Sequence, residues 1–183
     1  MKPDLKIPRG ISAVALTVLL VAGAFAAAPP AATEKPVVAA PRPLPSVAEA
    51  RERARLLHET LHATLQIVHH QYYRENQGLQ LPARTLKQVF AEVARRSDVR
   101  LQWLAVNTDA QNIDHNPKTE FEQNAAKSLA TGKPEFESVE HGTYRRAGAI
   151  TLHDECLSCH FPNRTTAKER TAGLIISMPV KKE

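Results

Sequence analysis

The chain has few cysteines: Cys156 and Cys159 are the only two among 183 residues. A disulfide between them would close a loop too short to stabilise a fold appreciably. The chain also lacks internal repeats and long blocks of like charge. Part of the formal net charge of +5 comes from Lys2, Lys6 and Arg9 at the N-terminus rather than from the domain. The composition therefore gives no support for nucleic acid binding.

The first 28 residues have the pattern of a secretory signal. Basic residues precede an unbroken apolar run from Ile11 to Ala28, and Ala24-Phe25-Ala26 matches an A-x-A cleavage site. The alternative is an uncleaved membrane anchor, because about 18 apolar residues are just enough to span a bilayer. Both interpretations place the folded part outside the cytoplasm, in the periplasm, with no other segment expected to touch the membrane.

Residues 29–46 are rich in proline and alanine and have few large side chains. Such a segment cannot bury enough surface to offset its ordering entropy, so a linker is predicted. Residues 47–183 are then expected to form one domain of ordinary size. No output module follows Glu183, which favours a free-standing protein over a receptor.

The hydrophobic pattern of this domain predicts an α+β fold with a small antiparallel sheet and a long N-terminal helix. Capping boxes of the form Ser/Thr-x-x-Glu begin at Ser46 and Thr119 and mark two helix starts. The cysteine segment is predicted to be a loop between late strands. The expected helices lie at about 47–75, 83–96 and 119–131, and the expected strands lie at 99–106, on both sides of a turn at 140–143, and in "TAGLIISMPV".

The cysteines and the following histidine, Cys156, Cys159 and His160, form C-x-x-C-H, the attachment motif for c-type haem. Each thiol adds to one vinyl group of the porphyrin, and the adjoining histidine binds the iron as the proximal ligand. The motif therefore predicts one covalently bound haem c. Covalent attachment suits an exported protein, because a loosely held cofactor would be lost by dilution.

Two other chemistries use this spacing. A thioredoxin-like dithiol needs a helix N-terminus within an α/β unit, whereas these cysteines lie between strands late in the chain. A zinc site needs four ligands and would have to recruit His160 and His153. Haem attachment requires neither an α/β unit nor further protein ligands to complete a zinc site, so it is the favoured interpretation.

The ligand on the second face of the iron is less defined by the sequence. His69 lies on the margin of the apolar face of the first helix, so it is the candidate distal ligand, although a boundary histidine bonded to backbone fits the same position. The alternatives are His70, which points away from that face, and Met178, whose apolar strand favours a core role. A thioether ligand would raise the reduction potential relative to imidazole. Three further histidines are predicted to lie at the surface: His115, His141 and His153.

Arginines can bind haem propionates through charge-assisted hydrogen bonds. Arg145 and Arg164 are the candidates, together with Arg146, although each residue also fits an exposed position. Trp103 is expected to be a core anchor, with packing on the haem as the alternative.

The chain resembles a family of small exported c-type haem proteins with a PAS-like fold, a domain that also occurs as the sensor part of bacterial signalling proteins. The resemblance rests on the long first helix, "NIDHNPKTEFE", "YRRAGAITL", "CLSCH" and "TAGLIISMPV", across roughly residues 50–180. It implies a PAS-like sheet with the haem held against it and His160 as the proximal ligand. In some relatives a cysteine on the first helix is the other ligand; here "QIVHH" stands in that region and indicates His69 or His70.

Together these features predict a monohaem c-type cytochrome domain that acts in one-electron transfer or redox sensing with a redox partner protein. The alternative is a haem-based sensor that binds a small diatomic gas. An enzyme is not expected. Peroxidase-like catalysis would need an iron with a free coordination position and an acid–base side chain beside it, and nothing in the sequence favours these features.

Overall fold

The structure is a computed structural model. It describes residues 43–74, 77, 78, 80–108, 110, 112–161, 163 and 168–182, and it describes residues 155 and 159 by their backbone alone. The predicted signal or anchor, residues 1–28, and nearly all of the predicted linker lie outside the described residues. Within the described ranges, no helix is long and apolar enough to cross a membrane.

Four antiparallel strands form one sheet in the order β1-β4-β3-β2. β3 and β4 are the central pair, in register from Thr143 opposite Pro179 to Leu152 opposite Arg170. The four strands span Arg100–Ala105 (β1), Glu135–Glu140 (β2), Thr143–Leu152 (β3) and Arg170–Pro179 (β4). The predicted α+β class with an antiparallel sheet is confirmed.

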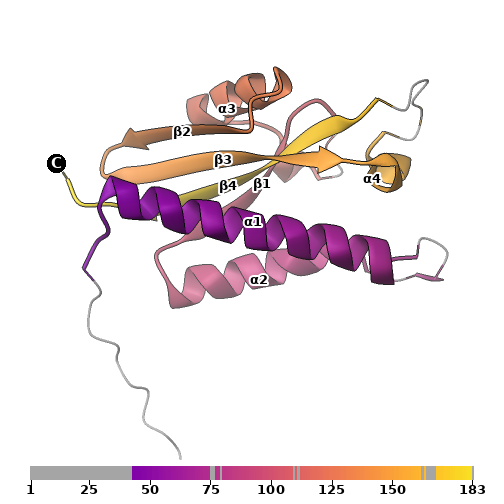
Figure 1. Ribbon diagram of the computed structural model, residues 1–183, viewed down its shortest axis with the longest axis horizontal. Helices are drawn as coiled ribbons and strands as arrows, with labels where there is room; N and C mark the ends of the chain where they lie inside the picture. Colours follow the sequence, from indigo (N-terminus) through magenta and orange to yellow (C-terminus); the bar gives the residue numbers. More distant parts are fainter. Residues whose placement is uncertain are drawn as a thin grey trace, which may run out of the picture. The chain divides into compact units, whose positions relative to one another are not determined.

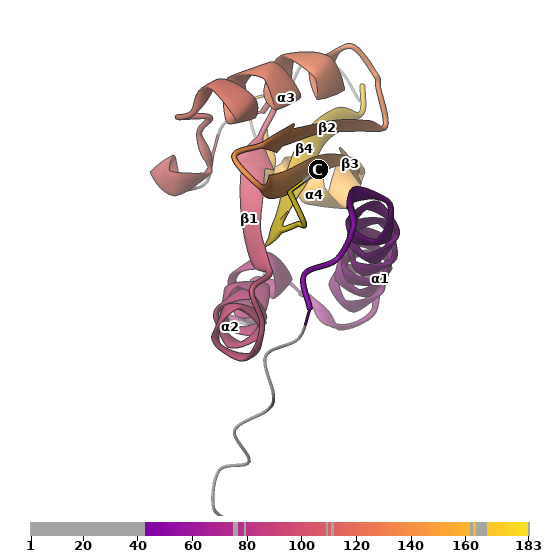
Figure 2. The ribbon, with the colours of Figure 1, turned by 90° about the vertical axis from the view of Figure 1, so that its left-hand side faces the viewer.

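Helices cover both faces of this sheet (Figures 1 and 2). α1 (Val47–Tyr72) and α2 (Pro82–Arg96) lie on one face, and α3 (Glu120–Ala130) lies on the other. Because successive side chains of a strand point to opposite faces, the strands supply two cores. Leu174 and Ile176 of β4 join the α1–α2 core, whereas Ile175 between them joins the α3 core.

The local signals at the helix starts form as predicted. The Ser46 hydroxyl accepts a hydrogen bond from the Glu49 backbone N–H and the Glu49 carboxylate caps the Ser46 N–H, and Thr119 and Glu122 repeat the arrangement at α3. Pro82 occupies the first turn of α2, where its missing N–H costs nothing. These caps satisfy backbone donors that a helix end leaves unpaired.

The cysteine segment is a short helix, α4 (Asp154–His160), and not the predicted loop. The His153 carbonyl accepts hydrogen bonds from the backbone N–H groups of Cys156 and Leu157, which closes the first turn. The Leu157 side chain is fully buried in the α1–α2 core. This anchor explains the correction, because seven residues have little helical stability of their own without tertiary packing.

Ion pairs fasten the first half of α1 to the β2–β3 hairpin. Arg51 binds Glu137 at 2.6 Å, and Arg55 binds Glu135 at 2.9 Å. Glu135 also accepts a 2.6 Å contact from Arg146, whose side chain is only 7 % exposed. A buried guanidinium without this carboxylate would be strongly destabilising, so the hairpin and α1 are held in one arrangement.

His58 of α1 packs directly on Gly148 of β3. A Cβ at position 148 would overlap the His58 imidazole and lie 2.7 Å from Nη1 of Arg146. His58 is buried, and burial, reinforced by the Arg146 charge, lowers its pKa from 6.5 to about 4. The close approach of α1 to the sheet therefore depends on a glycine in mid-strand and on a neutral imidazole above it.

We expect Gly148→Ala to destabilise the domain by about 3 kcal/mol, at the upper end of the cost of overpacking a core, because His58 and Arg146 cannot both move away. Thermal or urea unfolding measures this loss. In the control, His58→Ala combined with Gly148→Ala, the added methyl group meets no imidazole, so the effects of the two substitutions should not add. Simple additivity of the two effects would contradict the packing described.

The free energy of unfolding should also decrease as the pH falls from about 6.5 to about 4, because unfolded His58 binds a proton that the folded state excludes. Arg146 of β3 opposes protonation in the fold, as does His62 of α1, and Glu135 of β2 only partly offsets them. Urea unfolding over a pH series should show a smaller loss for His58→Gln than for the wild type. Equal losses in the two proteins would exclude His58 as the source.

Candidate functional site

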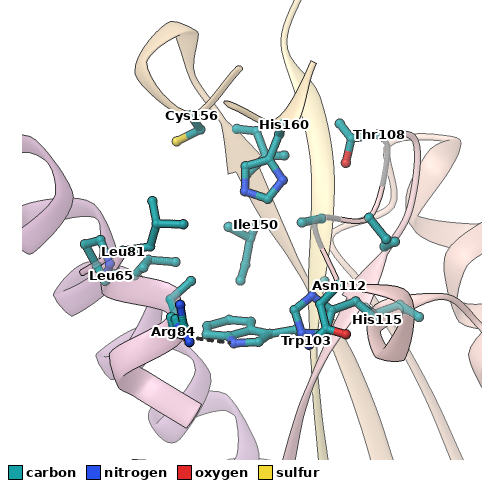
Figure 3. A pocket seen from close by; sticks show the side chains of 18 of the residues that line it. Leu65, Leu81, Arg84, Trp103, Thr108, Asn112, His115, Ile150, Cys156 and His160 are labelled. Atoms are coloured by element: carbon teal, nitrogen blue, oxygen red, sulfur yellow. Dashed lines mark hydrogen bonds between the residues drawn. The ribbon is translucent and has the colours of Figure 1, made fainter. Parts of the chain in front are cut away.

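A cavity of about 510 Å³ lies between the α1–α2 layer and the sheet, at the end where α4 joins the fold. Its walls are mainly apolar (Figure 3). The indole N–H of Trp103 donates to the Ala83 carbonyl at 3.2 Å, which holds the start of α2 against β1. The principal apolar walls are Leu65, Leu81, Trp103, Ile150 and Leu152.

α4 presents two of the predicted site residues to this cavity. Cys156 and His160 are four positions apart, so they lie on the same face of the helix, and both line the cavity. Figure 3 shows the His160 imidazole pointing into the space from α4. Cys159 belongs to the same helix, but its side chain lies outside the described part of the chain.

His160 is held in its neutral form. Burial lowers its pKa, and the positive charge that His69 can carry lowers it further. A neutral imidazole has a free lone pair, which is the form that binds a metal ion. The fold therefore presents a ligand-competent histidine beside a cysteine thiol in an apolar cavity.

Of the residues considered for the second ligand, only His69 lines this cavity. Its ring packs against Tyr73, with 5.0 Å between the ring centres. His70 lines a second pocket with His153 and Asp154, which also borders Cys156, and Met178 is buried in the α1–α2 core opposite Tyr144. Neither His70 nor Met178 lines the cavity that contains His160, so His69 is the favoured candidate for the second ligand.

His115 was expected at the surface, and the structure places it in the cavity wall instead. It ends the short 3-10 helix η2 (Ile113–His115), on the side of the cavity opposite His160 (Figure 3). Its Nε2 atom is buried and has no hydrogen-bond partner among the described residues. Burial lowers its pKa, and the nearby charge of Lys87 adds to the effect. Irregular chain carries no periodicity, so the sequence held no signal for this position.

Comparison with known proteins identifies the chain. The model of the Tll0287-like family matches residues 45–177. The chain belongs to the Tll0287-like family. Among solved structures, it is similar to one described as the cyanobacterial heme-protein Tll0287, with a TM-score of 0.57, 14 % identity, and coverage of 74 % of this chain and 98 % of that chain. No curated protein matches the chain.

The Tll0287-like fold confirms the PAS-like architecture expected from the sequence. The structure places two of the arginines considered for the haem propionates, Arg145 and Arg146, away from the cavity. Arg145 lies on the α3 face of β3, over the Phe121 ring and 3.8 Å from Glu140. Arg146 forms an ion pair with Glu135. Neither arginine lines the cavity: Arg145 is on the opposite face of the sheet, and Arg146 precedes Ile150 and Leu152, the residues of β3 that line it. Arg164 lies outside the described residues.

The basic side chains that do line the cavity of this Tll0287-like protein are Arg84 and Lys87, both on α2. They were not singled out in the sequence, because α2 also carries Arg95 and Arg96 and no local pattern distinguishes these basic residues. Among the described residues, no three His, Cys, Asp or Glu side chains form a group that could hold a metal ion by themselves.

Proposed function

We propose that this chain is an exported protein that carries one haem c, attached through Cys156 and Cys159 and bound at its iron by His160. The solved relative described as a heme-protein supports haem binding, and the C-x-x-C-H motif supports covalent attachment. The observation that carries the proposal is that Cys156 and His160 share one face of α4 and line the same apolar cavity.

The residues of the cavity fit this group. The volume falls within the range of about 300–1,000 Å³ that is usual for cofactor pockets, and the walls are mainly apolar. The buried Nε2 of His115 has no hydrogen-bond partner among the described residues, so a bound group in this space that accepts its hydrogen bond would remove a costly unmade bond. Neutral His160 can donate its lone pair without first losing a proton.

When bound, the haem would supply a one-electron couple at its iron. His160 would bind the iron, and His69 is the proposed second ligand, because it lines the same cavity. Two imidazole ligands and the apolar walls would keep water away from the metal. These features support electron transfer or redox sensing with a partner protein in the periplasm, and not catalysis.

Replacing both cysteines, Cys156→Ala with Cys159→Ala, should abolish covalently bound pigment, because no thiol remains to react with a vinyl group. Each single variant should keep one link and remain coloured after extraction. Extraction with acidified organic solvent and haem staining of a denaturing gel measure the attachment. Ser158→Ala, within the same motif, is the control and should retain all pigment. Pigment that washes out of the wild type would end the proposal.

His69→Ala should convert a six-coordinate, low-spin haem into a high-spin form, because the cavity loses the second imidazole. The optical spectrum measures the change. His70→Ala is the matched control, since His70 is the next residue of α1 and does not line the cavity that contains His160. An unchanged spectrum for His69→Ala would show that His69 is not the ligand.

The alternative function, binding of a small diatomic gas, predicts a different wild-type spectrum. A high-spin ferrous form that readily takes up carbon monoxide would favour gas sensing, whereas low-spin ferric and ferrous forms would favour electron transfer.

A further inference from the structure

Hydrogen-bond donors gather at the end of the cavity away from the Cys156 thiol. Arg84 and Lys87 are one turn apart on α2, and His115 approaches from η2. Figure 3 shows Cys156 and His160 at one end of the cavity, and Arg84, Trp103 and His115 at the other. Arg84 and Lys87 line the cavity and are also exposed, so they lie at its mouth.

These donors lack protein acceptors. Within the described part of the chain, Arg84 and Lys87 form no ion pair, whereas Arg95 and Arg96 at the far end of the same helix both bind Glu92. His115 keeps its Nε2 buried without a partner among the described residues. Two cations and an imidazole that face one space without an acceptor call for an anion with more than one oxygen.

The proposed haem has such groups on the required edge. Its two vinyl groups lie on one edge of the porphyrin, and its two propionate carboxylates lie on the opposite edge. Attachment of the vinyl edge to α4 therefore directs the carboxylates toward the other end of the cavity. We propose that Arg84, Lys87 and His115 form the binding site for the haem propionates, an inference that rests on the proposed function.

Each residue suits one part of this role. The Arg84 guanidinium can hold a carboxylate with two parallel hydrogen bonds, and Lys87 adds a second positive charge at the mouth. His115, neutral because burial and Lys87 lower its pKa, can donate one hydrogen bond from Nε2. The bond from Trp103 to Ala83 positions Arg84 and Lys87, because it fixes the start of α2 beside the cavity.

The test is the midpoint potential of the haem-loaded protein, measured in spectroelectrochemical titrations at about 0.15 M salt, where the screening length is about 8 Å. Arg84→Gln and Lys87→Gln each remove a positive charge beside the propionates. The ferric form is then stabilised relative to the ferrous form, so the midpoint potential should fall. His115→Phe should also lower the potential, and His115→Gln should restore it, because an amide N–H can replace the imidazole donor. Arg95→Gln is the control, with the same charge change on the same helix outside the cavity, and should leave the potential unchanged.

The optical spectrum of each variant separates this role from iron binding. All four cavity variants should keep the wild-type spin state, and their propionate bands in the resonance Raman spectrum should shift. A high-spin His115→Phe protein would make His115 an iron ligand and overturn the assignment. Potentials equal to that of Arg95→Gln would overturn it as well. A colourless wild-type protein would instead remove the proposed function itself, so the two failures are distinguishable.

Discussion

The burial of Leu157 is the interaction on which the rest of the site depends. This side chain lies inside the cysteine motif, between Cys156 and the second thiol position, and it is fully buried in the α1–α2 core. With Leu157 fixed, α4 can rotate little, and the residues on either side of it, Cys156 and His160, line the cavity. The motif is thus oriented by packing, which turns Cys156 and His160 toward the cavity.

The two ends of α1 serve different purposes. Near its start, Arg51 and Arg55 bind the β2–β3 hairpin, and His58 packs on bare backbone at Gly148, so the helix lies close to the sheet. Further along, Leu65 and His69 line the cavity instead. Close packing of the first half of α1 on the sheet holds the second half in place along the cavity. A site for a large planar group requires walls that are held in this way.

The sequence predicted the regular parts of the fold well because their signals are local. The capping boxes at Ser46 and Thr119 and the alternating apolar residues of "TAGLIISMPV" each specify an element without knowledge of its neighbours. α4 was missed because its stability comes from Leu157 in a distant core, which no local pattern reveals. The position of His115 was missed for the same reason, because the tertiary fold places the end of η2 in the cavity wall. The sequence could not show that Arg145 lies on the α3 face of β3, because the face that bears the cavity depends on where α1 packs.

The polarity of the cavity also limits how a haem could lie in it. At the α4 end burial lowers the pKa of His160, which favours its neutral form, and the adjoining walls are apolar. At the mouth, Arg84 and Lys87 are unpaired within the described residues and exposed to solvent. Carboxylates turned toward Ile150 and Leu152 would lose their hydration without gaining a cation, at a cost of several kcal/mol per charge. Attachment at α4 and charge at the mouth therefore favour one and the same orientation, so covalent chemistry and electrostatics support each other.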